Sequence, residues 1–324
     1  MPDSSRYALI GAAGYVAPRH MQAIRDTGGI LDAAYDPADS VGVMDRYSPD
    51  ALFFTEFERF AEYLGTVRHG PARIDRIAIC SPNDLHKPHV AFALRVGADA
   101  ICEKPLVLEP GDIDDLVELE AATGGRVNTI LQLRLHPAII ELRDRIARTN
   151  AVHDVELTYV TARGRWYYAS WKGDDKRSGG IATNIGVHFY DMLAFVFGEP
   201  VANVVHHRAA DCAAGYLEFE RARVRWFLSI NRRDMAGTDG FALRCMTVEG
   251  VGKFDFSKGF EDLHTASYRE IDAGRGFPLA AARPAVEIAS RIRKAALDPH
   301  TGPQHSHLGR VFADTGRYDG GRPV

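Results

Sequence analysis

The stretch Ala100-Ile101-Cys102-Glu103-Lys104-Pro105 decides how the rest of the chain is organised. Its apolar residues end in a charged pair, which is typical of a buried parallel strand reaching the sheet edge where α/β proteins bind ligands. Pro105 lacks an amide hydrogen and has a fixed φ, so it ends the strand and holds Lys104 in a defined direction. A solvated lysine in a turn is the alternative. The surrounding motifs decide between the two interpretations.

Composition narrows the class of protein. The chain has 324 residues, 46% of them hydrophobic and 25% charged, so it is long enough for two domains of ordinary globular composition. A formal charge of -4 argues against nonspecific nucleic-acid binding. No stretch reaches the ~18 apolar residues of a membrane span, and the first residues do not resemble a signal peptide. We therefore expect a cytoplasmic protein with neither nucleic-acid nor membrane partners.

The four cysteines are far apart in the chain and share no metal-ligand spacing. We therefore expect neither disulfides nor a metal site.

A glycine-rich turn follows the first apolar segment, residues 7–10, and leads into a helix expected over residues 20–26. In this order, amides of the turn and helix can face a pyrophosphate, as in a dinucleotide site. In the usual G-x-G-x-x-G pattern Ala13 takes the place of the second glycine and Gly14 follows, so a plain strand-helix connection stays open. The residues expected at the cofactor here are Gly11, Ala13, Gly14, Tyr15 and Val16.

The next strand, residues 30–35, ends at Asp36, about 20 positions beyond the turn. A carboxylate there accepts hydrogen bonds from an adenosine ribose and favours NAD over NADP. Asp36 could instead simply start the loop that follows, because Asp and Pro are turn formers. We favour the ribose interpretation and expect Ser40 to lie at the cofactor with Asp36.

Strands and helices alternate through residue 132, which predicts a doubly wound parallel sheet and a Rossmann domain over residues 1–132. The expected strands after residue 150 are separated by turns, which predicts an α/β domain with a mainly antiparallel open sheet over residues 133–298. Residues 299–324 are rich in Gly, Pro and His and are expected to form a disordered tail. The fold class is therefore α/β.

The second half also carries a loop, residues 163–173, that is too aromatic and too basic for a featureless connection. A helix expected over residues 183–197 follows it and contains Asn184-Ile185-Gly186-Val187-His188-Phe189-Tyr190-Asp191.

The order of these motifs resembles the glucose-fructose oxidoreductase/inositol dehydrogenase (Gfo/Idh/MocA) family over nearly the whole chain except the tail. The motifs are Gly11 to His20, Ser81-Pro82-Asn83 with His86, Glu103-Lys104-Pro105, and Gly186-Val187-His188 with Asp191. Within the family, residues 11–20, 130–134, 170–174 and 182–191 look like the WlbA type. WlbA proteins oxidise the C3 hydroxyl of UDP-N-acetyl-glucosaminuronic acid, a step towards diacetamido uronic acid sugars of surface polysaccharide such as lipopolysaccharide.

This resemblance implies NAD as cofactor and a homodimer or homotetramer formed through the open sheet. It places the active site between the domains, with Lys104 and His188 meeting at the sugar hydroxyl beside the nicotinamide. The further cofactor contacts that it implies are Ser81, Pro82, Asn83, His86, Glu103, Lys104, Gln132, Trp166 and Tyr167. The implied substrate contacts are Lys104, Arg134, Arg163, Arg165, Tyr167, Lys172, Asn184 and His188.

The chemistry suits these residue types. Hydride removal from a secondary alcohol requires the hydroxyl proton to leave, and an imidazole of pKa near ~6.5 can accept it. Lys104 would stabilise developing alkoxide charge. We favour His188 as the base, although which of the two takes the proton is open, and a helix-packing histidine is the alternative for His188. Positions i and i+4 share a helix face, so Asn184 should accompany His188 at the substrate.

Three other functions stay open. The same chemistry could act on another nucleotide-linked or free sugar, such as UDP-N-acetylglucosamine. Bound NAD could instead serve transiently in a non-redox elimination or hydrolysis, and a catalytically silent NAD-binding regulator is the third alternative. The reduced cofactor could leave after each turnover or be reoxidised in place by 2-oxoglutarate.

Overall fold

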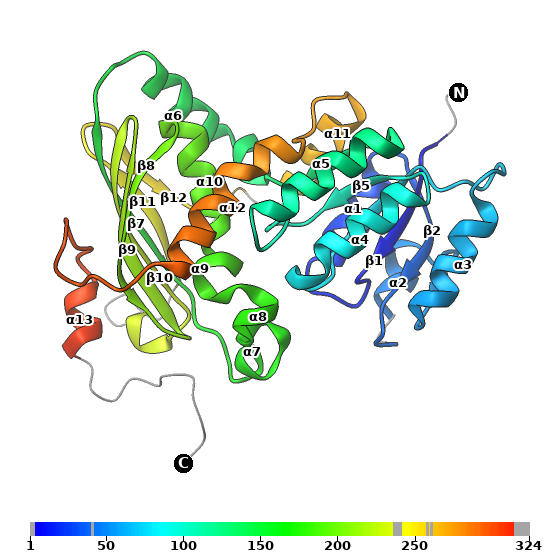
Figure 1. The fold of residues 1–324 in the computed structure, drawn as a ribbon, viewed down its shortest axis with the longest axis horizontal. Helices are drawn as coiled ribbons and strands as arrows, with labels where there is room; N and C mark the ends of the chain where they lie inside the picture. The colour runs from blue at the N-terminus through cyan, green and yellow to red at the C-terminus, as the bar shows by residue number, and fades with distance from the viewer. Residues whose placement is uncertain (1–3, 40–41, 236–241, 257–258, 260–261, 314–324) are drawn as a thin grey trace. The chain divides into compact units, whose positions relative to one another are not determined.

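The computed structural model describes residues 4–39, 42–235, 242–256, 259 and 262–313. The chain divides into two compact units (Figure 1). The first contains Met1–Gln132 and Asp262–Arg283, and the second contains Leu133–Glu261 and Pro284–Val324. The return of Asp262–Arg283 to the first unit corrects the prediction that residues 133–298 all belong to the second domain.

The first unit is built on a six-stranded sheet of order β3-β2-β1-β4-β5-β6, in which every described pair is parallel. Its strands are β1 (Arg6–Ile10), β2 (Ile30–Tyr35), β3 (Leu52–Phe54), β4 (Arg76–Ile79), β5 (Asp99–Cys102) and β6 (Val127–Thr129). The direction of winding reverses between β1 and β4, so ligands are expected at the carboxyl ends of these strands. The predicted doubly wound parallel sheet is confirmed.

Helices cover this sheet (Figure 1), and apolar residues of some of them join strand residues in a buried cluster. They are α1 (Ala17–Asp26), α2 (Gly42–Tyr47), α3 (Phe57–Val67), α4 (His86–Arg95), α5 (Gly111–Thr123) and α11 (Leu263–Asp272), with a short 3-10 turn at Asn83–Leu85. Met21 and Ile24 of α1 share one buried cluster with Tyr268 and Ile271 of α11. The segment that returns from the second half therefore completes the core of the first unit.

The second unit contains a six-stranded sheet of order β12-β11-β7-β10-β9-β8. Its strands are β7 (His153–Val160), β8 (Pro200–Arg208), β9 (Cys212–Phe219), β10 (Ala222–Ser229), β11 (Leu243–Val248) and β12 (Gly252–Asp255). β7 and β10 are parallel, and the other neighbouring pairs are antiparallel. The predicted mainly antiparallel sheet is confirmed.

One face of this sheet packs on helices through a core that includes Leu157, Trp226 and Leu193. The helices of the unit are α6 (Pro137–Ala147), α7 (Trp166–Ala169), α8 (Asp175–Ser178), α9 (Gly180–Asn184), α10 (Gly186–Phe197) and α13 (Leu308–Ala313). The 3-10 turns are Gln132–Leu135, Trp171–Gly173 and Arg232–Met235. Helix α12 (Leu279–Lys294) begins in the first unit and continues past Pro284 into the second.

The helix predicted over residues 183–197 is broken at Ile185, where α9 ends and α10 begins. Gly186 opens α10, and a Cβ atom there would lie 2.6 Å from the hydroxyl oxygen of Tyr190. Only glycine therefore lets Tyr190 pack back against the helix start.

Within the described ranges, no single helix is long and apolar enough to cross a membrane. The bent pair Asp175–Asn184 and Gly186–Phe197 passes a test of length and composition when the two are taken together. Ile181, Val187 and Leu193 of this pair belong to the buried core of the second unit, which accounts for its apolar character.

The first part of the expected tail is ordered, which corrects the prediction. Leu308 and Val311 of α13 share a buried cluster with Phe227. The ring of His305 is buried, stacks on Phe227 with centroids 5.5 Å apart, and places Nε2 3.0 Å from Thr158 Oγ1. These contacts hold residues 299–313 on the second sheet, whereas residues 314–324 lie outside the described residues.

Candidate active site

The glycine-rich turn after β1 packs closely on the end of β4. Gly11 has a φ of +90°, and a Cβ atom there would lie 2.6 Å from the carbonyl carbon of Cys80. An alanine would therefore meet both backbone strain and a clash. The amides of Tyr15 and Val16, just before α1, make no hydrogen bond within the described part of the chain. Unpaired amides at a helix start are what a bound pyrophosphate requires, so the turn fits the cofactor.

Asp36 stands at the end of β2 with its carboxylate oriented by two backbone amides. Oδ2 accepts from the amide of Ala13 at 3.0 Å, and Oδ1 accepts from the amide of Ala38 at 2.9 Å. A carboxylate has about four acceptor positions, so these two bonds leave it capacity for ribose hydroxyls. The bond to Ala13 also ties the glycine-rich turn to the predicted ribose site. Ser40 lies outside the described residues.

The segment after β4 is held by two buried histidines. Ser81 Oγ lies 2.8 Å from His89 Nδ1. His86 places Nδ1 2.6 Å from the carbonyl oxygen of Pro105 and Nε2 2.9 Å from that of Ser81. The ring of His86 is 1% exposed and engaged at both nitrogens. His86 therefore joins this segment to Pro105, and its cofactor contact stays a prediction.

Pro82 directly precedes the 3-10 turn Asn83–Leu85, and Asn83, its first residue, is 4% exposed. Gln132, the last residue of the first unit's opening segment, is 8% exposed, and its Oε1 has no hydrogen-bond partner among the described residues. A buried polar atom without a partner is costly. A bound cofactor amide or hydroxyl would satisfy it, so Gln132 fits its predicted role.

Glu103, Lys104 and Pro105 follow β5 directly, as the apolar run predicts, and the Lys104-Pro105 peptide bond is cis. Lys104 is half-buried. Burial lowers the pKa of its ammonium, the negative charge of Glu103 opposes this, and the positive charge of Arg19 adds to it. The Lys104 ammonium is thus placed where it loses a proton more easily than a lysine in water.

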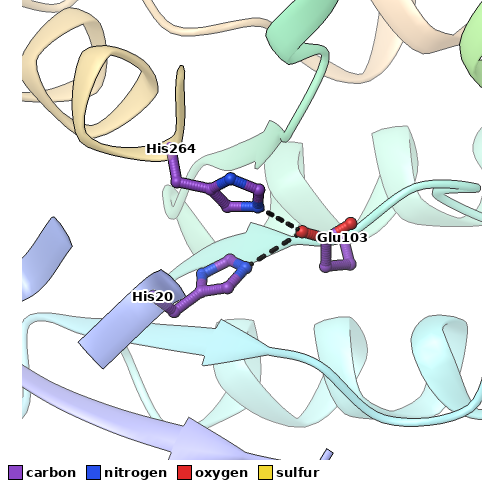
Figure 2. A group of neighbouring side chains, drawn as sticks. All are labelled: His20, Glu103 and His264. Atoms are coloured by element: carbon purple, nitrogen blue, oxygen red, sulfur yellow. Dashed lines mark hydrogen bonds and ion pairs between the residues drawn. The ribbon is translucent and has the colours of Figure 1, made fainter. Parts of the chain in front are cut away.

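Glu103 is buried, and its carboxylate faces the imidazoles of His20 and His264 (Figure 2). Its Oε1 lies 3.1 Å from His20 Nε2 and 2.9 Å from His264 Nε2, while Oε2 accepts from the amide of Lys104 at 3.2 Å. Burial alone would raise the pKa of Glu103, but the bonds from the two imidazoles outweigh it and hold the pKa well below its usual range. These bonds tie Glu103 to His20, His264 and the backbone of Lys104, and its cofactor contact stays a prediction.

In the second unit, His188 occupies the first turn of α10 and is half-buried. Asn184 ends α9, and its Nδ2 donates to the hydroxyl of Tyr167 at 2.9 Å. Tyr167 is 3% exposed, whereas Trp166 beside it is 56% exposed. The aromatic loop therefore has a buried ring that orients Asn184 and an exposed ring available for stacking.

The cations predicted for the substrate have different surroundings. Arg134 makes a bidentate pair with Asp191, with Nη2 2.7 Å from Oδ1 and Nε 3.0 Å from Oδ2. Burial raises the pKa of Asp191 to about 6, although Arg134 opposes the change. Lys172 places its Nζ 4.3 Å from the ring centroid of Trp171. Arg163 and Arg165 are exposed, so these two are the better candidates for an anionic ligand.

Two family models match the chain. An oxidoreductase family with an NAD-binding Rossmann fold matches residues 5–130, and its C-terminal alpha/beta domain matches residues 150–238. The chain belongs to the Gfo/Idh/MocA oxidoreductase family. The predicted family and its NAD-binding domain are confirmed, and the glycine-rich turn and Asp36 lie in that domain.

Solved structures of this family include a close relative. The WlbA (WbpB) dehydrogenase from Thermus thermophilus, in complex with NAD and alpha-ketoglutarate, is 47% identical, with a TM-score of 0.90. The match covers 94% of this chain and 99% of that one. The same enzyme with NAD and UDP-GlcNAcA is 48% identical over 92% of this chain and 97% of its own, with a TM-score of 0.88.

Curated relatives are more distant. Inositol 2-dehydrogenase of Rhizobium meliloti is 25% identical over 61% of this chain and 57% of its own length. The matches to three such relatives span between 40% and 59% of their lengths.

Two sets of partners at this site were not predicted from the sequence. His264 and Tyr268 lie far along the chain from Glu103 and carry no motif of their own, and His20 appeared only as the end of the glycine-rich turn. The pairing of Arg134 with Asp191 could have been inferred from one signal, because both residues stand in motifs that resemble the family.

Proposed function

We propose that this chain oxidises the C3 hydroxyl of UDP-N-acetyl-glucosaminuronic acid to the 3-keto sugar with NAD as acceptor. The observation that carries the proposal is 48% identity over 92% of the chain to an enzyme solved with NAD and UDP-GlcNAcA. The family's catalytic motif positions, Lys104 and His188, are both present in this chain. The proposal covers the reaction, the sugar and the residues that act on it.

The reaction removes a hydride from C3 and a proton from its hydroxyl oxygen, which leaves a carbonyl. Bound NAD supplies the hydride acceptor. We assign the removal of the hydroxyl proton to His188 as general base, because an imidazole accepts protons near neutral pH. We assign to Lys104 the stabilisation of the negative charge that develops on this oxygen, because its ammonium can donate a hydrogen bond to the oxygen.

Substrate selection is assigned to the second unit. The bond from Asn184 to Tyr167 orients an amide that we assign to a sugar hydroxyl or the acetamido group. Arg163 and Arg165, both exposed, are assigned to the anionic groups of the UDP-sugar acid. Arg134 is assigned a smaller part than predicted, because Asp191 already pairs with its guanidinium.

Three wider aspects belong to the same proposal. Reoxidation by 2-oxoglutarate is supported by the Thermus thermophilus structure that holds NAD and alpha-ketoglutarate. A role in making surface polysaccharide sugars follows from the proposed product. A cytoplasmic location and a homodimer or homotetramer stay predictions, the latter testable by sedimentation.

The test incubates the full-length protein with NAD and UDP-N-acetyl-glucosaminuronic acid, with and without 2-oxoglutarate. Mass spectrometry then follows the loss of two hydrogens from the sugar. We expect a 3-keto uronic acid, and with 2-oxoglutarate we expect product in excess of NAD together with 2-hydroxyglutarate. UDP-N-acetylglucosamine and the Lys104→Ala protein are run alongside as controls.

Each other outcome contradicts a defined part of the proposal. If only UDP-N-acetylglucosamine is oxidised, the acidic substrate is wrong. If the sugar loses a substituent without losing two hydrogens, the enzyme is a non-redox member of the fold. If neither sugar changes while NAD binds, the dehydrogenase assignment fails for this substrate class.

A further inference from the structure

The carboxylate of Glu103 is the most enclosed charged group beside Lys104. It is 5% exposed, and three donors from three separate parts of the chain converge on it. His20 lies on α1 and His264 on α11 (Figure 2). The third donor is the amide of Lys104 itself. Burying a carboxylate costs free energy unless its oxygens accept hydrogen bonds. The three donors around Glu103 meet this requirement and indicate that its buried charge has a role.

The positions of the protons in this group follow from the partners. His20 Nδ1 lies 2.8 Å from the hydroxyl of Tyr268, and burial raises the pKa of Tyr268 well above its usual value, so the phenol keeps its proton. Burial also lowers the pKa of His20, which keeps the ring neutral. A neutral His20 that accepts from Tyr268 at Nδ1 must carry its hydrogen on Nε2, where it donates to Glu103.

These bonds form one directed chain. Tyr268 donates to His20, His20 and His264 donate to Oε1 of Glu103, and the Lys104 amide donates to Oε2. The carboxylate is consequently ionised and fixed, with its charge directly beneath the Lys104 backbone. The charges that act on Lys104 are Glu103 beside it and Arg19 on α1. The ring of His86 on α4 also interacts with Lys104, but burial lowers the pKa of that ring and favours its neutral form.

We propose that the chain Tyr268, His20, Glu103 and His264 is a positioning device that keeps Lys104 in its charged form and fixes the end of β5. The inference rests on the role that the proposed function gives to Lys104. The Lys104 ammonium must be protonated to stabilise an alkoxide, while burial and Arg19 both favour proton loss. Glu103 is the nearby negative charge that opposes them.

The same three side chains could in principle bind a cation. Their ligand atoms lie within 4.8 Å of one another, and two imidazoles with one carboxylate can bind zinc. However, with the protons placed as above, each hydrogen-bonded pair of atoms in this group already consists of one donor and one acceptor. A divalent cation would also add positive charge next to Lys104 and Arg19. We therefore assign protons to these contacts and make a metal one outcome of the test.

The test measures the pKa of Lys104 directly in the full-length protein, without substrate. The chain has only seven lysines, so lysine labelled with ¹³C at Cε gives few resonances, and Lys104→Arg assigns the relevant one. Glu103→Gln keeps the shape and removes the charge. We expect the pKa of Lys104 to fall by about one unit or more and the alkaline limb of the kcat/KM profile to move by the same amount.

Variants of the imidazoles separate positioning from folding. His264→Leu removes the donor, whereas the amide of His264→Gln can reach the position of Nε2. We expect a fall in the Lys104 pKa in the Leu protein and its recovery in the Gln protein, with NAD affinity retained in both. Tyr268→Phe removes only the hydroxyl that fixes the His20 tautomer, and we expect a smaller fall. If the thermal midpoint drops in all of these variants and the Lys104 pKa stays unchanged, the role is structural and the proposal is overturned.

The remaining outcomes distinguish this inference from the proposed function. If Glu103→Gln shifts the Lys104 resonance while Lys104→Ala retains turnover, the positioning effect exists but the catalytic role is wrong. If Lys104→Ala abolishes turnover while Glu103→Gln leaves the Lys104 pKa unchanged, the proposed function holds and the positioning device is overturned. Stoichiometric metal in the purified protein, absent from His264→Leu, would overturn the assignment of protons.

Discussion

The surroundings of Lys104 and of His188 are built in different ways. Lys104 follows β5, an interior strand of a parallel sheet, and both carboxylate oxygens of its neighbour Glu103 accept hydrogen bonds from buried groups. His188 lies in the first turn of α10, just after the helix is interrupted at Ile185. The nearby loop carries an exposed tryptophan and exposed arginines. The first environment fixes geometry and charge, and the second exposes groups that can select a substrate.

The largest effects should come from Lys104 and His188, the two residues that we propose to be catalytic, with different signatures. Lys104→Ala and His188→Ala should each lower kcat/KM by about 10³, a size typical of lost general-base or electrostatic catalysis. His188→Ala should abolish the acidic limb of the pH profile, and Lys104→Ala the alkaline limb. Steady-state rates between pH 6 and pH 10 check this. Loss of the acidic limb in Lys104→Ala would exchange the two roles.

Gly11→Ala should show how rigid the cofactor region is. The new Cβ atom would lie 2.6 Å from the Cys80 carbonyl carbon at a φ of +90°, so we expect a loss of at least about 2 kcal/mol in unfolding free energy. NAD affinity should fall about tenfold or more, because the turn must move. Gly42→Ala is the matched control, since its Cβ atom meets nothing within 4 Å. Equal effects in both variants would contradict the close packing.

The two units should respond to acid with opposite signs. In the first, burial lowers the pKa of His89 to about 4, so His89 stabilises the fold above its unfolded pKa of 6.5 and loses this as pH falls. In the second, burial raises the pKa of Asp191 to about 6, so its contribution is present below 3.8 and lost as pH rises through 6.

Urea unfolding at pH 7 and pH 5 measures both contributions. Relative to the native chain, His89→Asn should gain about 1.5 kcal/mol on going from pH 7 to pH 5, and Asp191→Asn should lose about as much. Changes of the same sign in both variants would refute the difference between the units.

The smallest effect is expected from the exposed cations. Arg163→Ser and Arg165→Ser should raise the KM for UDP-N-acetyl-glucosaminuronic acid by about 3- to 10-fold, because exposed ion pairs contribute only about 1 kcal/mol each. The KM for UDP-N-acetylglucosamine should change less. Arg148→Ser, at an exposed position after α6, is the control. Equal changes for both sugars would show that these arginines do not recognise the carboxylate.

Local patterns in the sequence were sufficient for much of the architecture. Apolar runs ending at Asp36 and Lys104 predicted the parallel strands correctly, because a strand buried on both faces needs continuous apolar residues. The position of Lys104 at the end of β5 followed from the apolar run before it and from Pro105 after it. The break at Ile185 could not be predicted, since it depends on how Tyr190 packs against Gly186 in three dimensions.

Long-range partners were beyond reach for a related reason. The sequence around Glu103 does not show whether its carboxylate faces a cofactor or two imidazoles. Its partner His264 lies 161 positions further along the chain. The sequence around Arg134 does not distinguish an arginine that binds substrate from one that pairs with Asp191 in the fold. The ordered segment around His305 was missed because Gly and Pro richness does not reveal a stacked ring.

The return of Asp262–Arg283 to the first unit has a consequence for synthesis on the ribosome. The 161 residues from Lys104 to His264 take roughly 8 to 30 seconds to translate at 5–20 residues per second. During that interval the nascent Rossmann sheet has a buried glutamate with half of its imidazole donors and an apolar surface still waiting for α11. The amino-terminal domain of this enzyme is therefore completed only after most of the carboxyl-terminal domain has been made.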